Sequence, residues 1–210
     1  LSHSSAASDV YKRQNLSFSI NFGDNSEGSP GMRLQTFCED SYEFHTLVDP
    51  IATFCYQPIT NQPEIKIIPG QPIRFIAVIP SICEVNAGFA IRIKGEDLWG
   101  NPSDQCSQTF LLKSKTKIKN LPDSITLKTG DFSHTISNLF SSDEGEICVE
   151  FYDSSNNLCF VTNPSRLEKK PKLKYFWADL HGQSEETIGT GSSEQYFKFD
   201  RDRAFVDATA

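Results

Sequence analysis

Residues 15–162 of this chain are patterned in short segments of β type, and no helical period of useful length interrupts them. Three runs alternate apolar and polar residues strictly, with apolar members at Leu16, Phe18, Ile20 and Phe22, at Phe89, Ile91 and Ile93, and at Ile147, Val149 and Phe151. A period of two places successive side chains on opposite faces of a sheet, so each run predicts a strand with one buried face. Clusters of turn residues separate these runs from further apolar runs at 51–56, 73–79, 110–112 and 158–161. We therefore expect a mainly β chain folded as an immunoglobulin-like antiparallel β-sandwich.

The composition divides the chain into four parts. Residues 1–14 have no amphipathic period and almost no apolar side chains, so we expect a non-native or disordered leader that does not pack. The β-sandwich region should span 15–162, with its immunoglobulin-like part at about 64–162. Residues 163–173 are polar, basic and punctuated by prolines, which predicts a surface linker. Residues 174–210 begin a new pattern that stops within a structured run, so we expect the N-terminal fragment of a longer protein.

The last part of the chain predicts a strand, a loop and a helix. Tyr175 to Leu180 is an apolar run that predicts a buried strand, and Gly182 to Gly191 is a loop of small and acidic residues. Either Ser192 or Ser193 can cap the helix that follows, with an acidic residue in its first turn. Strand, loop and helix in this order form the first unit of an α/β barrel. Such barrels hold their active sites at the carboxyl ends of their strands, where this loop lies.

A set of metal-ligand side chains follows the predicted strand directly. Asp179, His181 and Gln183 lie two residues apart, so in an extended chain they project to one side. Imidazole suits Zn, Mn or Fe, whereas carboxylates suit harder divalent ions. The spacing by itself also fits a loop in which the aspartate and the histidine cap backbone groups, and it favours that simpler interpretation.

The hexapeptide Asp-Leu-His-Gly-Gln-Ser at 179–184 resembles the first motif of the PHP (polymerase and histidinol phosphatase) family of metal-dependent hydrolases, usually Asp-x-His-x-His. The chain is similar to an uncharacterised branch of that superfamily with an N-terminal β-sandwich. Further similar segments are residues 185–191, 194–199 and 201–205, and upstream 33–39, 97–102 and 163–164. Gln183 stands where the wider family has its second histidine, which leaves the number of bound metals open.

The resemblance implies a metal-dependent hydrolase of phosphoesterase type, acting on a small-molecule substrate with divalent Zn, Mn or Fe. His181 would be a direct ligand, and Asp179 would orient an imidazole or bridge two ions. Gln183 offers only a neutral oxygen, while Glu185 or Glu186 could supply an anionic ligand. The other ligands would come from later strands, so we expect the chain as given to be inactive, without an assigned catalytic residue and possibly without metal.

A second function class stays open, in which the sandwich itself binds a glycan or a protein and has no catalytic role. Trp99, beside a turn, could be a sugar-stacking platform, although tryptophan at such a place more often packs on a sandwich rim. The formal net charge of −7 disfavours a general nucleic-acid binder. No apolar run approaches the length of a membrane span, and no export signal is visible, which favours the cytoplasm.

The cysteines favour free thiols in a reducing compartment over a disulfide framework. None of the six forms a Cys-x-x-Cys pair, so a zinc knuckle or thioredoxin-like motif is not expected. They stand at positions 38, 55, 83, 106, 148 and 159.

Overall fold

The computed structural model describes residues 19–189 and 191–210 and separates the chain into two compact units, Leu1–Thr36 and Phe37–Ala210. In the first unit the described residues form turns, and neither a strand nor a helix appears among them. Ile20 and Phe22 are 64% and 60% exposed, so the strand predicted from alternation is wrong at 19–22. Alternation says which side a strand would bury, but only pairing with a second strand forms one. Leu16, Phe18 and the predicted leader lie outside the described residues.

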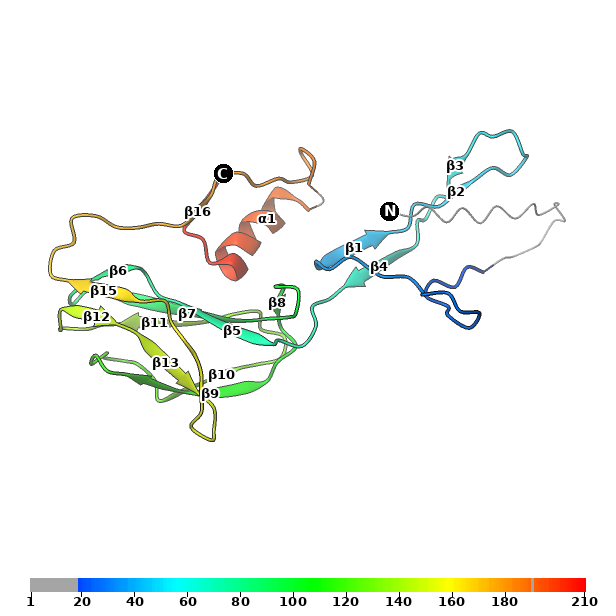
Figure 1. The fold of residues 1–210 in the computed structure, drawn as a ribbon. Coiled ribbons are helices and arrows are strands. Elements are labelled where there is room, and N and C mark those ends of the chain that lie inside the picture. Colours follow the sequence, from blue (N-terminus) through cyan, green and yellow to red (C-terminus); the bar gives the residue numbers. More distant parts are fainter. Residues whose placement is uncertain (1–18, 190) are drawn as a thin grey trace. The chain divides into compact units, whose positions relative to one another are not determined.

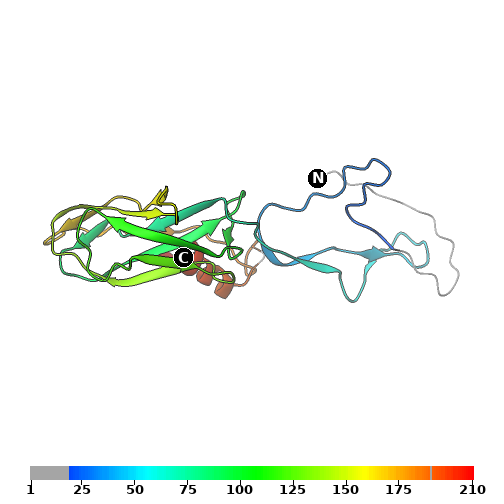
Figure 2. The same cartoon turned by 90° about the horizontal axis from the view of Figure 1, so that it is seen from below.

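Two antiparallel sheets in the second unit make the sandwich. One has the order β11-β7-β5, with β8 paired to the end of β7, and the other has the order β10-β9-β13-β14. Figures 1 and 2 show the long strands of both sheets running roughly along one another. The bounds are β5 Arg74–Val78, β7 Phe89–Glu96, β8 Pro102–Ser103, β9 Gln108–Ser114, β10 Ser124–Leu127, β11 His134–Leu139, β13 Val149–Tyr152 and β14 Leu158–Val161.

The order of these strands is immunoglobulin-like. The longer strands of the two sheets are counted here in chain order, without β8 and without the small sheet described next. The first, second and fifth (β5, β7 and β11) share one sheet, and the third, sixth and seventh (β9, β13 and β14) share the other. The fourth, β10, pairs with β9, so it belongs to the second sheet instead of the first. The predicted mainly β, immunoglobulin-like sandwich is confirmed.

A third, smaller sheet has the order β12-β15-β6 and contains a parallel pair. Its strands are β12 Gly145–Ile147, β15 Ser165–Glu168 and β6 Ile82–Glu84, with β15 parallel to β6. Ser165 and Leu167 are buried, and the hydroxyl of Ser165 donates to the carbonyl oxygen of Pro80 at 2.5 Å. The predicted surface linker at 163–173 is therefore wrong at 165–168, because a partner strand some eighty residues earlier buries this segment.

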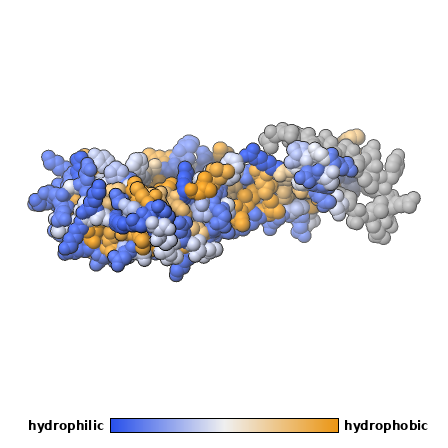
Figure 3. Space-filling view, turned by 60° about the horizontal axis from the view of Figure 1, so that its bottom comes forward, coloured by the Kyte–Doolittle hydropathy of each residue, from blue (hydrophilic) through white to orange (hydrophobic). Residues whose placement is uncertain are grey.

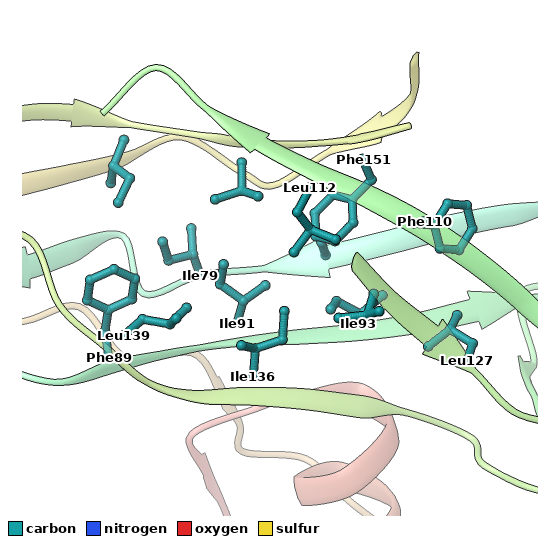
Figure 4. Close-up of a cluster of buried hydrophobic side chains, with 14 of the residues drawn as sticks. Ile79, Phe89, Ile91, Ile93, Phe110, Leu112, Leu127, Ile136, Leu139 and Phe151 are labelled. Carbon is teal, nitrogen blue, oxygen red and sulfur yellow. The ribbon is translucent and has the colours of Figure 1, made fainter. Parts of the chain in front are cut away.

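The core lies between the two main sheets and follows the alternation read from the sequence. Phe89, Ile91 and Ile93 of β7 point inward toward the facing strands (Figure 4). Ile147 and Val149 are fully buried as predicted, but the chain changes sheet between them, from β12 to β13.

Four phenylalanines join the two sheets within this core. Phe151 stacks on Phe160 with ring centroids 4.4 Å apart, and Phe75 of the other sheet lies edge-on to Phe110 at 4.9 Å. Phe75 also stacks on Phe160 at 5.6 Å. Aromatic pairs at these distances and angles are favourable beyond the apolar area that they bury.

Residues 39–67 form a two-stranded ribbon whose tip carries apolar side chains. β1 (Glu39–Glu43) pairs with β4 (Glu64–Ile67), and β2 (Leu47–Val48) pairs with β3 (Gln57–Pro58), both antiparallel. The apolar run predicted as a strand at 51–56 is instead irregular and exposed. We call residues 49–56 the ribbon tip.

A buried aspartate holds the loop between β7 and β8. Both carboxylate oxygens of Asp97 accept hydrogen bonds, from the backbone N–H groups of Gly70, Trp99 and Asn101 and from the Asn101 side chain. Trp99, in the middle of this loop, is 56% exposed. The loop therefore owes its shape to the hydrogen bonds of Asp97 and presents the tryptophan at the surface.

The C-terminal part contains a parallel β-α-β unit. β16 (Ala178–Asp179) and β17 (Ala208–Thr209) pair in parallel, and α1 (Ser193–Phe199) with the π-helical turn η1 (Asp200–Ala204) connects them. Ser192 caps α1 as predicted, since it accepts from the Gln195 N–H while the Gln195 side chain accepts from the Ser192 N–H.

The run from Tyr175 to Leu180 is exposed, so the predicted buried strand is wrong. Only Ala178 and Asp179 pair, with β17, and Phe176, Trp177 and Leu180 are 70%, 65% and 77% exposed. A two-residue pair covers too little of the run to bury its side chains. Apolar areas recur among hydrophilic ones over the face drawn in Figure 3.

Candidate functional site

The β16-α1-β17 unit is docked on the sandwich through aromatic and cationic groups. Phe205 is buried, and the ammonium of Lys94 on β7 lies 5.3 Å from the centre of its ring. The guanidinium of Arg203 lies 3.6 Å from the ring centre of Phe132. Cations over aromatic rings attract, most strongly where water is excluded. A cavity of about 270 Å³ lies beside this contact, with Tyr175 and Trp177 on one side and β6 and β7 on the other.

Asp179 and His181 lie together at the carboxyl end of β16, but the aspartate caps the backbone. Asp179 Oδ1 accepts from the His181 N–H at 3.0 Å. The His181 side chain is exposed. This is the capping arrangement that the spacing favoured, and the role of either residue as a metal ligand stays a prediction.

Gln183 and Glu186, the other predicted ligands, are engaged within their own loop. Gln183 Oε1 accepts from the Thr187 hydroxyl at 3.0 Å, and the Glu186 carboxylate accepts from the Ser184 hydroxyl. Hydrogen bonds from Ser184 and then Ser193 hold the pKa of Glu186 below its usual range. Over 19–189 and 191–210, no three His, Cys, Asp or Glu side chains gather in a group that could hold a metal ion.

The backbone at Gly182, in the Asp-Leu-His-Gly-Gln-Ser hexapeptide, has no room for a side chain. A Cβ atom on Gly182 would overlap the ring of Tyr196, which lies against the backbone of the loop. The hydroxyl of Tyr196 in turn shares a 2.5 Å hydrogen bond with the hydroxyl of Thr209 on β17. Tyr196 therefore ties together the loop after β16, the helix α1 and the strand β17.

The ribbon tip is a candidate binding site that the sequence interpretation missed. Ile51, Phe54 and Tyr56 are 70%, 87% and 58% exposed. Asp49 organises the tip, because its carboxylate accepts from the Phe54 N–H at 2.6 Å, from the Ile51 N–H and from the Thr53 hydroxyl. An Asp-Pro pair ahead of an apolar run was the signal that could have identified a turn here.

The tip holds two residues in an unusual backbone conformation. Ala52 and Phe54 have φ values of 53° and 60°, in the left-handed region that glycine prefers. Such a conformation costs on the order of 1–3 kcal/mol for a residue with a side chain and persists only where its surroundings impose it. The hydrogen bonds to Asp49 are those surroundings, and they hold the backbone at Phe54 in this conformation.

The cysteines contribute no disulfide to any of these places, and all six are free. Cys83 and Cys106 are buried in the sandwich core. Burial raises the pKa of both thiols, which keeps them protonated and unreactive.

None of the helices in the described residues is long and apolar enough to span a bilayer.

Comparison with known proteins shows distant likeness to solved structures alone. No family model and no curated protein matches the chain. A solved structure, the D0-D1 domain of Intimin, is similar with 12% sequence identity and a TM-score of 0.34. The match covers 52% of this chain and 56% of that one, so this chain spans little more than half the length of its structural neighbour. A likeness of this size carries no argument about function, and the β-sandwich rests on the strands themselves.

Proposed function

We propose that the sandwich with its ribbon is a non-catalytic binding module that holds a protein partner through the ribbon tip. The observation that carries this proposal is the side chain of Phe54, 87% exposed on a backbone that Asp49 fixes. Large apolar side chains presented on rigid loops are the usual anchors of protein interfaces, where a few such residues supply most of the affinity.

The chemistry of the ribbon favours a protein over a glycan as the partner. Ile51 and Phe54 offer no hydrogen-bonding side-chain group, whereas a sugar needs donors and acceptors for its hydroxyls. The strands farther along the ribbon from the tip, β1 and β4, are acidic, with Lys66 as their one basic residue and with acidic residues at Glu39, Asp40, Glu43 and Glu64. A partner that complements this ribbon has an apolar pocket for the tip and, farther along, lysine or arginine that faces β1 and β4.

Replacing Ile51, Phe54 and Tyr56 together by serine should weaken partner binding at least tenfold, because each substitution removes one apolar side chain that would anchor the partner. The chain is immobilised, a protein captured from extract of the source organism is purified, and its Kd is measured against both forms. The sandwich should keep its unfolding midpoint, because all three side chains are exposed.

Trp99→Ala is the matched control, since Trp99 is also exposed but lies on the β7–β8 loop. It should leave the protein Kd unchanged. A glycan array probed with both variants tests the alternative. Glycan binding lost in Trp99→Ala and kept in the serine variant would replace this proposal by a sugar-binding module.

A second candidate is that the sandwich is the accessory domain of a PHP-like metal-dependent hydrolase. The parallel β16-α1-β17 unit supports it, because parallel strands joined by a helix build α/β barrels. The exposed apolar run at 175–180 also supports it, since parallel strands are normally covered on both faces. In this reading Zn, Mn or Fe would be held by His181 and Asp179, and by residues beyond this sequence.

In a full-length parent protein, His181→Ala should then remove most of the bound metal and the hydrolysis of phosphate esters, whereas Gln183→Ala should reduce both only modestly. Metal content measured by mass spectrometry on the purified proteins checks this. If the His181→Ala protein keeps its full complement of metal, His181 is not a ligand and belongs only to the loop that Asp179 caps.

A further inference from the structure

Four residues with oxygen-bearing side chains are brought to the ends of β16 and β17 by strand pairing and by the helical segment. Asp179 and Thr209 are Cα partners across the parallel pair, so their side chains project from the same face. The Tyr196 hydroxyl lies 2.5 Å from the Thr209 hydroxyl on that face. Asp200 follows Tyr196 by four residues, which places both on one side of the helical segment.

Asp200 is the unusual member of this group. It is 4% exposed, and within the described residues its Oδ2 atom has no hydrogen-bond partner. A buried carboxylate oxygen without a partner is costly, and a bound ion or water is one of the arrangements that satisfy such an atom. A cation beside Asp200 would relieve that cost.

The two carboxylates come from different elements of the same unit. Asp179 lies on β16, paired with Thr209, and Asp200 caps the end of α1. Each would gain from a cation placed between them.

The basic side chains of α1 and η1 are occupied elsewhere. Lys198 pairs with Glu194 at 2.6 Å, and Arg201 pairs with Asp202 at 2.6 Å. Arg203 lies over Phe132. In the described part of the chain, none of these three cations forms an ion pair with Asp179 or Asp200.

We propose that Asp179, Tyr196, Asp200 and Thr209 form a binding site for a hard divalent cation, Ca²⁺ or Mg²⁺. Two carboxylates and two hydroxyls are oxygen ligands, which these ions prefer, and water would complete the coordination. The site goes beyond the protein-binding module proposed above, and it uses no imidazole, so it differs from the Zn, Mn or Fe chemistry expected of His181.

The test is a calorimetric titration of the whole chain with Ca²⁺ and, separately, with Mg²⁺. The wild-type chain should bind one ion, and its unfolding temperature should rise with ion concentration because the ion binds only the folded state. Asp200→Asn should weaken binding at least tenfold and remove the thermal shift. Tyr196→Phe, which keeps the ring against Gly182, and Thr209→Val should each weaken binding less, and they carry the test if Asp200→Asn does not fold.

His181→Ala is the control and should bind Ca²⁺ or Mg²⁺ as the wild type does. Two results would overturn the site. In the first, His181→Ala abolishes binding while Asp200→Asn retains it, which would assign the ion to the Asp-x-His motif. In the second, the wild type binds neither ion and Asp200→Asn is more stable, which would make Asp200 an uncompensated buried charge. The ribbon-tip serine variant should bind the ion normally, so failure here is distinct from failure of the protein-binding proposal.

Discussion

Phe151→Ala is expected to lower the free energy of unfolding by about 3–5 kcal/mol, which is a large fraction of the stability of an ordinary domain. Phe151 is fully buried and stacks on Phe160 with a ring-centroid distance of 4.4 Å. Alanine removes the ring contacts and leaves a cavity between two sheets that cannot collapse around it. Urea unfolding followed by far-UV circular dichroism measures the change.

Phe54→Ala is the matched control for Phe151→Ala. It removes the same side chain from a position that is 87% exposed, so the free energy of unfolding should change by less than about 0.5 kcal/mol. Equal losses for the two variants, or a loss below about 1 kcal/mol for Phe151→Ala, would contradict a core built between these sheets.

Asp97→Ala is expected to cost roughly 2–4 kcal/mol at neutral pH, because a buried carboxylate that accepts several hydrogen bonds is lost and its donors are left unpaired. Burial by itself would raise the pKa of Asp97, but hydrogen bonds from Asn101, Gly70 and Trp99 outweigh it and lower that pKa. A lowered folded-state pKa means that the carboxylate stabilises the fold above its unfolded pKa of about 4 and loses this effect as pH falls through the folded value. The difference between wild type and variant should therefore be constant from pH 5 to 7 and shrink below about pH 4.

Asp153→Ala provides the comparison for Asp97. Asp153 caps the β13–β14 turn in the same manner, accepting from the N–H groups of Ser155 and Asn157, but it is only partly buried. Its loss should cost clearly less than the loss of Asp97. Urea unfolding over a series of pH values settles both points, and a gap for Asp97→Ala that widens in acid would reverse the assigned pKa direction.

Much of the sandwich could be predicted from the sequence because the alternation of apolar and polar residues marks its strands without reference to distant residues. The alternation at Phe89, Ile91 and Ile93 gave both the strand β7 and the face that it buries. The alternation at Ile147 and Val149 gave the buried side chains, but it could not show that the chain changes sheet between them. That change depends on β15 and β9, which are distant in sequence.

The errors share one physical cause, since strand formation and burial depend on partners elsewhere in the chain. β15 lies within a polar, proline-punctuated segment, and it is a strand because β6 and β12 pair with it. Tyr175 to Leu180 has the composition of a buried strand, yet only two of its residues pair. The ribbon tip was missed because its distinguishing feature, the left-handed backbone at Phe54, depends on hydrogen bonds to Asp49.

The candidate metal site was predictable only in part. The sequence placed Asp179 and His181 at the end of a strand before a capped helix, and the structure has them there. The sequence around Asp200 did not indicate a ligand. Asp200 became a candidate only because the structure buries it, four residues after Tyr196. The ligand roles of His181, Asp179, Gln183 and Glu186 remain predictions.

The pairing of β6 with β15 has a consequence for how this chain reaches its folded state. Arg166 lies opposite Ile82, and Asn163 exchanges two hydrogen bonds with Ile79, so residues more than eighty positions apart must meet. Closing so long a loop costs entropy before any contact compensates for it, and folds that depend on distant contacts form slowly, in milliseconds to seconds. During synthesis β6 must therefore wait for its parallel partner until residues 165–168 have left the ribosome.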